Sequence, residues 1–260
     1  MIGVDGLDQA LLAGVMLAAF AAGLVDSAVG GGGLIQIPAL FSALPHFDVA
    51  TLFGTNKFSS IFGTINAAWR YTRRVHMPWR TTLPAALAAF ACAYLGAMAV
   101  AWLPPAMLRP LILLLLVGAA VYTFSRRDFG AIHQPQHTGR REFVYAVLLG
   151  GGIGFYDGFF GPGTGSFLIF LFIRFFGFDF LHASAASKVV NVATNLAALA
   201  FFVPHRHVLP LLAMLMAGCN VLGSFLGAHL ALRHGSGFVR KAFLCVVGVF
   251  ILKFAYDTFA

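Results

Sequence analysis

Residues 26–38 read DSAVGGGGLIQIP, and residues 157–169 read DGFFGPGTGSFLI. In each stretch an aspartate stands four residues before a glycine-rich run, and an apolar segment follows. Such a run breaks a helix and leaves backbone N–H groups unpaired at the start of the next one. The second stretch follows the first by 131 residues, since 157 minus 26 is 131. Two such breaks in one chain indicate two copies of one unit.

The same offset aligns other residues without a gap, including polar ones. Chance similarity between apolar segments would match Leu, Ala and Val, and would rarely place a lysine on a lysine. We therefore predict a first transmembrane repeat at 1–125, a basic polar linker at 126–141 and a second transmembrane repeat at 142–260. The identities include Asp26 with Asp157, Gly30 with Gly161, Gly32 with Gly163, Asp48 with Asp179, Lys57 with Lys188, His76 with His207, Gly96 with Gly227 and Arg109 with Arg240.

The composition places this duplicated chain in a lipid bilayer. Of its 260 residues, 60% are hydrophobic and only 10% are charged, whereas soluble proteins average about 25% charged residues. The net charge of +8 could suggest nucleic-acid binding, but the lysines and arginines cluster at the ends of apolar segments, where they act as topology anchors. We expect an all-α polytopic membrane protein and no nucleic-acid partner.

Each repeat is expected to contain one short segment among longer spans. The piece from Gly33 to Leu44 would extend about 18 Å as a helix, too short for about 30 Å of hydrocarbon. If this half-helix is re-entrant, the two repeats are inverted; if it completes a broken span, they are parallel. Loop charge favours inversion, with the amino terminus outside. The spans of the first repeat are predicted at 7–29, 49–72, 81–103 and 106–125, and the second half repeats this layout.

Polar side chains inside two spans mark the candidate site. A lysine at the centre of a membrane helix costs about 2.5–3.5 kcal/mol on insertion scales, so Lys57 and Lys188 should face water, a counter-ion or an anionic ligand. Helical spacing places polar neighbours on one stripe of each span. The alternative is that the small polar residues only form hydrogen bonds between helices. The predicted substrate-binding residues are Asn56, Lys57, Ser60, Thr64, Ser187, Lys188, Asn191 and Asn195.

The glycine-rich breaks form a second part of this site. The amino end of a half-helix carries partial positive charge and can bind an anion. Two aspartates, Asp26 and Asp157, stand where the preceding helices break. They either transfer a coupling proton or have a structural role, capping freed N–H groups or pairing with the two lysines. The predicted backbone anion site comprises Gly30, Gly31, Gly32, Gly33, Gly161, Gly163, Thr164 and Gly165.

These motifs resemble those of a known family. Gly30 to Pro38 (GGGGLIQIP) and Gly54 to Lys57 (GTNK), echoed by 161–165 (GPGTG) and 185–188 (AASK), are similar to the TauE/SafE family of sulfite-exporter-like permeases. The resemblance implies a bacterial inner-membrane secondary transporter for sulfite or an organosulfonate. The second half departs from the pattern, because Thr164 replaces the fourth glycine and no proline matches Pro38.

The residues themselves favour a small anion, and together with the resemblance the leading hypothesis is its transport by alternating access around a midplane site between the two repeats. An anion channel is the first alternative. A membrane enzyme that uses Asp26 and Asp157 as paired acid and base is a weaker alternative, because the sequence contains no Ser-His-Asp arrangement, HExxH or CxxCH motif, and spacing does not show that the two carboxylates meet. No Walker motif is present either, so we expect no ATP hydrolysis by this chain. We expect no catalytic residues, metal or cofactor. A small anionic substrate, a coupling proton or other ion and the lipid bilayer are the expected partners.

Overall fold

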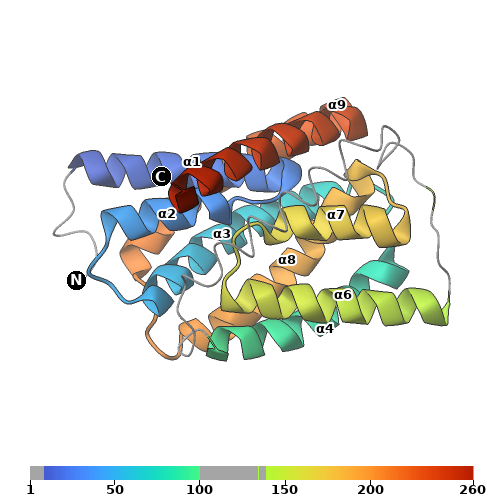
Figure 1. The fold of residues 1–260 in the computed structure, drawn as a ribbon, viewed down its shortest axis with the longest axis horizontal. Coiled ribbons are helices and arrows are strands. Elements are labelled where there is room, and N and C mark those ends of the chain that lie inside the picture. The colour runs from blue at the N-terminus through green and yellow to red at the C-terminus, as the bar shows by residue number, and fades with distance from the viewer. Residues whose placement is uncertain (1–8, 100–133, 135–138, 260) are drawn as a thin grey trace.

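The computed structural model describes residues 9–99, 134 and 139–259, and every regular element in these ranges is a helix (Figure 1). The predicted span at 106–125 and most of the 126–141 linker lie outside the described residues. The helices are α1 (Gln9–Val29), α2 (Gly33–Ala43), α3 (Val49–Thr72), α4 (Trp79–Ala99), α6 (Arg140–Phe159), α7 (Thr164–Phe176), α8 (Phe180–Phe202) and α9 (Pro210–Phe259).

The helical bundle has the dimensions and surface of a multi-pass membrane protein. Four described helices are long and apolar enough to cross a bilayer: α1, α4, α8 and the 210–245 part of α9. Large apolar side chains cover the outside, and Leu17, Leu87 and Leu148 are each about two-thirds exposed. Such a surface suits contact with lipid tails rather than water.

The two short helices double back beside the helices that precede them (Figure 1). Leu40, near the end of α2, packs in one apolar cluster with Val15 from the first half of α1. In the second half, the rings of Tyr145 near the start of α6 and Phe175 near the end of α7 are 6.3 Å apart. Both half-helices are therefore re-entrant, which is the first of the two alternatives considered from the sequence.

The equivalent helices α3 and α8 run in opposite directions. Ser184 at the start of α8 donates a hydrogen bond to the Tyr71 hydroxyl at the end of α3. At the other end, a Cβ on Gly54 would lie 3.1 Å from the Cβ of Phe202. An antiparallel course of two helices related by the 131-residue offset is what inverted repeats require. The duplication itself stays a prediction from the sequence.

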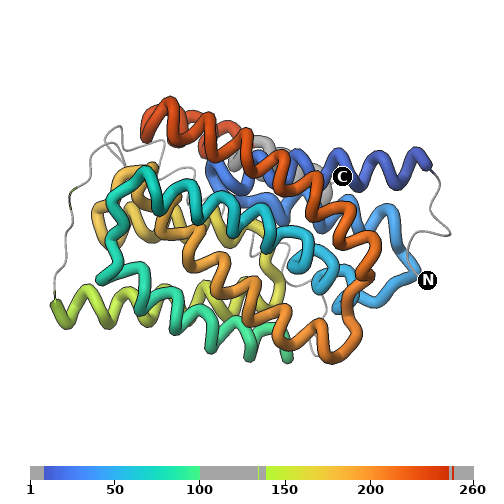
Figure 2. The backbone as a smooth tube through the Cα atoms, turned by 180° about the vertical axis from the view of Figure 1, so that it is seen from behind, coloured from blue at the N-terminus to red at the C-terminus, as the bar shows by residue number. Residues whose placement is uncertain are grey.

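Small residues let the outer helices pack closely against one another. Gly150, Gly154 and Gly158 on α6 face the backbone of Ala85, Ala89 and Ala93 on α4. Residue numbers increase together along the two helices at these contacts, so α4 and α6 run parallel. Figure 2 shows these two helices side by side. Backbone contact through small residues is a common way of packing membrane helices.

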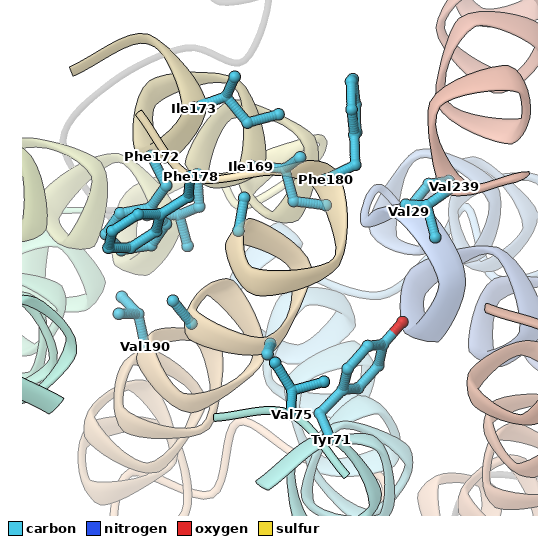
Figure 3. Close-up of a cluster of buried hydrophobic side chains, with 14 of the residues drawn as sticks. Val29, Tyr71, Val75, Ile169, Phe172, Ile173, Phe178, Phe180, Val190 and Val239 are labelled. Carbon is cyan, nitrogen blue, oxygen red and sulfur yellow. The ribbon is translucent and has the colours of Figure 1, made fainter. Parts of the chain in front are cut away.

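An aromatic core supports the end of the bundle to which α7 returns. Phe172, Phe178 and Phe180 belong to one cluster of buried side chains, with Val239 from the last part of α9 (Figure 3). The Tyr71 ring enters the same cluster, and its hydroxyl donates to the Ser27 carbonyl oxygen across 3.0 Å. This contact joins the end of α3 to the break after α1.

Candidate functional site

The two glycine-rich breaks have the backbone geometry that glycine permits. Gly30 and Gly31 have φ values of 79° and 93°, and Gly161 and Gly163 have values of 88° and 82°. Residues with a Cβ rarely adopt such left-handed conformations. Each break therefore turns the chain sharply from the end of one helix into a half-helix that runs back.

The two breaks meet in the middle of the bundle. A Cβ on Gly165 would lie 2.7 Å from the Cα of Gly30, so the two backbones are in direct contact. Ser166 adds a hydrogen bond from its Oγ to the carbonyl oxygen of Val29 across 3.3 Å. The amino ends of α2 and α7 are thereby brought together from opposite halves of the chain.

The N-cap residues of α2 and α7 are Gly32 and Gly163, which have no side chain that could accept a hydrogen bond from the helix start. The neighbouring long helices differ in this respect. The Asp48 carboxylate accepts a hydrogen bond from the Thr51 N–H at the start of α3, and Asp179 accepts one from the His182 N–H at the start of α8. The amino ends of the half-helices keep their partial positive charge for another partner.

Two ion pairs cross between the halves of the chain. Lys57 on α3 places its Nζ 2.6 Å from Oδ2 of Asp157 on α6. Lys188 on α8 places its Nζ 3.3 Å from Oδ2 of Asp26 on α1. Each lysine thus reaches the aspartate of the other half of the chain. Of the two roles considered for the aspartates, pairing with the lysines is the one seen in the structure.

The two pairs differ in exposure. The side chains of Lys57 and Asp157 are 5% and 2% exposed. In the other pair Lys188 is fully buried, whereas Asp26 is 18% exposed. The short distance between the Lys57 Nζ and Oδ2 of Asp157 is typical of a charge-assisted contact.

A polar cavity lies where the breaks and ion pairs meet. Its empty volume is about 420 Å³, including the opening to solvent. Both half-helix starts border it, as do α1, α3, α6, α8 and α9. Its lining is formed by Ala22, Asp26, Gly31, Gly32, Gly33, Asn56, Lys57, Ser60, Thr64, Asp157, Gly161, Gly163, Thr164, Gly165, Asn191, Asn195 and Asn220.

Most of the residues predicted from the sequence border this cavity, but three do not. Gly30 is pressed against Gly165 in the contact between the breaks. Ser187 donates its hydroxyl to the Ser184 carbonyl oxygen within α8. Lys188 lies outside the lining and is fully buried against Asp26. Helical spacing places Ser187 and Lys188 on the polar stripe of α8, but only part of that stripe faces the cavity.

The prediction missed Asn220 on α9. Its Nδ2 donates to the Ala19 carbonyl oxygen across 3.2 Å and to Oε1 of Gln36 across 3.1 Å. Gln36 in turn donates to the Ser59 hydroxyl. An asparagine inside an apolar span is itself a signal of function or polar packing. The polar lining therefore extends from the two lysine-containing helices to α9.

The comparisons with known proteins agree with this architecture. Residues 15–254 match the family described as Sulfite exporter TauE/SafE. A probable membrane transporter protein, ORF9, from a Sinorhizobium species is 37% identical over 237 residues, covering 91% of this chain and 89% of the relative. Escherichia coli K12 YfcA, also named a probable membrane transporter protein, is 30% identical over 249 residues, covering 95% and 91%. A Haemophilus influenzae protein with that description is 29% identical over 256 residues, covering 98% and 97%. No solved structure matches.

Proposed function

Since the chain belongs to the Sulfite exporter TauE/SafE family, whose relatives here are named membrane transporters, we propose that it is a secondary transporter that moves a small oxyanion across the inner membrane. The observation that supports this best is the cavity at which two uncapped half-helix ends and Lys57 converge. Sulfite and organosulfonates are the substrates that the family name suggests. The residues themselves specify only an anion rich in oxygen acceptors.

The donors around the cavity suit such an anion. Backbone N–H groups at a helix start attract negative charge, and the hydroxyl and amide groups of Ser60, Asn191 and Asn195 can donate to anionic oxygens. The two lysines and two aspartates nearby cancel in formal charge. In the paired state the attraction for an anion therefore comes mainly from the helix ends and the neutral donors.

This balance suggests how a proton would be coupled to transport. If Asp157 takes up a proton, Lys57 keeps an uncompensated positive charge beside the cavity, and the affinity for an anion rises. By linkage, a bound anion favours protonation of the aspartate to the same extent. Asp26, which also borders the cavity, has the same relation to Lys188. The site would thus bind an anion and a proton together.

The crossing of the ion pairs favours a carrier over a channel. Each pair joins one half of the chain to the other, so opening a pair releases a constraint between the halves. Alternating access needs the halves to move relative to each other around a fixed site. A channel with the same cavity would pass anions without such movement.

Counterflow in proteoliposomes tests the proposal. Vesicles loaded with unlabelled sulfite should accumulate labelled sulfite transiently, and sulfonates or carboxylates added outside show the substrate class by competition. Flux of labelled anion that never exceeds equilibrium would favour a channel. Absence of flux for every anion, from protein that remains folded, would contradict anion transport.

Two serine variants show whether the cavity is the binding site. Ser60 borders it, whereas Ser187 does not and bonds within its own helix. Ser60→Ala should raise the apparent KM for the transported anion roughly fivefold, the effect of about 1 kcal/mol for one hydrogen bond. Ser187→Ala, the matched control, should leave KM unchanged. Equal effects of both variants would contradict binding in this cavity.

A further inference from the structure

A second cavity lies between the end of α3 and the middle of α9, and the transport proposal does not involve it. Its empty volume is about 830 Å³, including its opening, and four of its seven lining residues are arginines. It shares no lining residue with the central cavity. The lining consists of Trp69, Arg70, Arg73, Arg74, His229, Leu232 and Arg233.

Two arginines of this cavity, Arg70 and Arg73, lie over aromatic rings. The Cζ atom of Arg70 is 3.6 Å from the centre of the Phe225 ring, and that of Arg73 is 4.7 Å from the Trp69 ring. No ion pair within the described part of the chain includes a lining arginine. Stacking fixes the plane of a guanidinium and leaves its N–H groups available.

Arg70 also has an unsatisfied donor. Its Nε is buried and has no hydrogen-bond partner among the described residues. A buried donor without a partner costs free energy, so a ligand oxygen that accepts from it would be favoured. Together with the other guanidinium groups, it suits an oxyanion that can accept several charge-assisted hydrogen bonds.

The surface beside this cavity is apolar. On α3, Phe62, Ile65 and Trp69 recur at helical spacing and are each 41–56% exposed. On α9, Leu222 and Phe225 are 63% and 49% exposed. Both rows lead along their helices toward the arginines. Exposed apolar rows are the parts of a membrane helix that contact acyl chains, and tryptophan is typical of the depth at which chains give way to headgroups.

The position in the bundle agrees with an interfacial depth. The carboxyl end of α3, the amino end of α6 and the carboxyl end of α7 lie at one end of the molecule, on the right in Figure 1. These ends include Arg140, Arg141 and Arg174. A concentration of arginines at one end is typical of the cytoplasmic side of a membrane protein, where anionic headgroups are plentiful.

We propose that this cavity binds the phosphate of an anionic phospholipid. The phosphodiester oxygens accept hydrogen bonds from the guanidinium groups of Arg70 and Arg73, and the acyl chains lie along the apolar rows of α3 and α9. A free phosphate would share the first set of contacts but not the second. Because α3 also contains Lys57, a lipid bound here would hold that helix against α9.

Native mass spectrometry of the full-length protein in detergent tests the proposal, with dioleoyl phosphatidylglycerol, dioleoyl phosphatidylcholine and inorganic phosphate as separate probes. Phosphatidylglycerol should remain bound. Inorganic phosphate lacks the acyl chains, and phosphatidylcholine has a choline cation that the four arginines repel, so both should bind more weakly. Arg70→Gln/Arg73→Gln should weaken phosphatidylglycerol binding about 30-fold, as expected for two charges near an anionic surface. Arg140→Gln/Arg141→Gln, which removes the same charge at the same end of the bundle, should bind normally.

Several outcomes would overturn the assignment. Equal weakening in the Arg140/Arg141 variant would show diffuse attraction to a basic end instead of a pocket. Retention of inorganic phosphate as strong as that of the lipid would assign the cavity to a soluble anion. If the Arg70/Arg73 variant does not fold, a photoactivatable phosphatidylglycerol on the wild-type protein gives the answer, because crosslinks should fall within 62–74 and 222–233. Crosslinks elsewhere would refute the proposal.

Discussion

Breaking the ion pair between Lys57 and Asp157 should cost more stability than removing both of its charges. The two side chains are almost fully buried and their charged atoms are 2.6 Å apart. Lys57→Met leaves a buried carboxylate without its counter-ion, and the loss of one partner of a buried pair costs about 3–5 kcal/mol. Adding Asp157→Asn removes the orphaned charge, so the double variant should recover most of that loss.

The other pair provides an internal comparison. Lys188→Met leaves Asp26, which is 18% exposed and borders the polar cavity, so water can solvate its charge. Lys188→Met should therefore destabilise the protein less than Lys57→Met does. Asp26→Asn, in contrast, leaves the fully buried Lys188 ammonium unpaired and should be the more damaging half of that pair.

Thermal unfolding of the purified protein in detergent, followed by intrinsic fluorescence, gives the order of stabilities. A double-mutant cycle on Lys57 and Asp157 should show a coupling of about 3 kcal/mol. If the effects of the two single variants simply add, the charges do not interact in the folded protein, and the crossed pairing is refuted. Counterflow by the double variant then tests the coupling role of Asp157, because its exchange should respond less to a pH gradient than that of the wild-type protein, which has both aspartates.

Two further changes test the central contact and a helix cap. Gly165→Ala should destabilise the protein by about 1–3 kcal/mol, because the added Cβ would lie 2.7 Å from the Cα of Gly30. Gly152→Ala is the control, since Gly152 has open space around it and the variant should keep its stability. Equal melting temperatures for the two variants would contradict the contact between the breaks. Asp48→Ala should cost about 1 kcal/mol at neutral pH through loss of the cap on α3. Burial raises the pKa of Asp48, but hydrogen bonds from Thr51 and the nearby His207 together lower it by more, so the pKa lies below its usual 3.8. The wild-type advantage should therefore be present above pH 3.8 and disappear as the pH falls through the lowered value. An advantage that persists in stronger acid would refute the cap.

Much of the local structure follows from the residues themselves. The short helix predicted from Gly33 to Leu44 is found at Gly33–Ala43, and the segment predicted at 49–72 forms the helix α3. These limits are local, because a left-handed glycine interrupts the helical backbone at its own position and an aspartate cap begins a helix. The polar stripes on α3 and α8 could be recognised for the same reason, since helical spacing is a property of one segment.

The sequence by itself determined that the chain is an apolar helical protein with two glycine-rich breaks, each four residues after an aspartate, and it predicted that the two halves are related. Only the tertiary structure decided that Lys57 meets Asp157 and Lys188 meets Asp26, that Lys188 and Ser187 lie outside the cavity, and that Asn220 borders it. The physical reason is that a helix period fixes which residues share a face, whereas the partner of that face depends on how segments from opposite halves pack. Ion pairs and cavities arise from such long-range contacts.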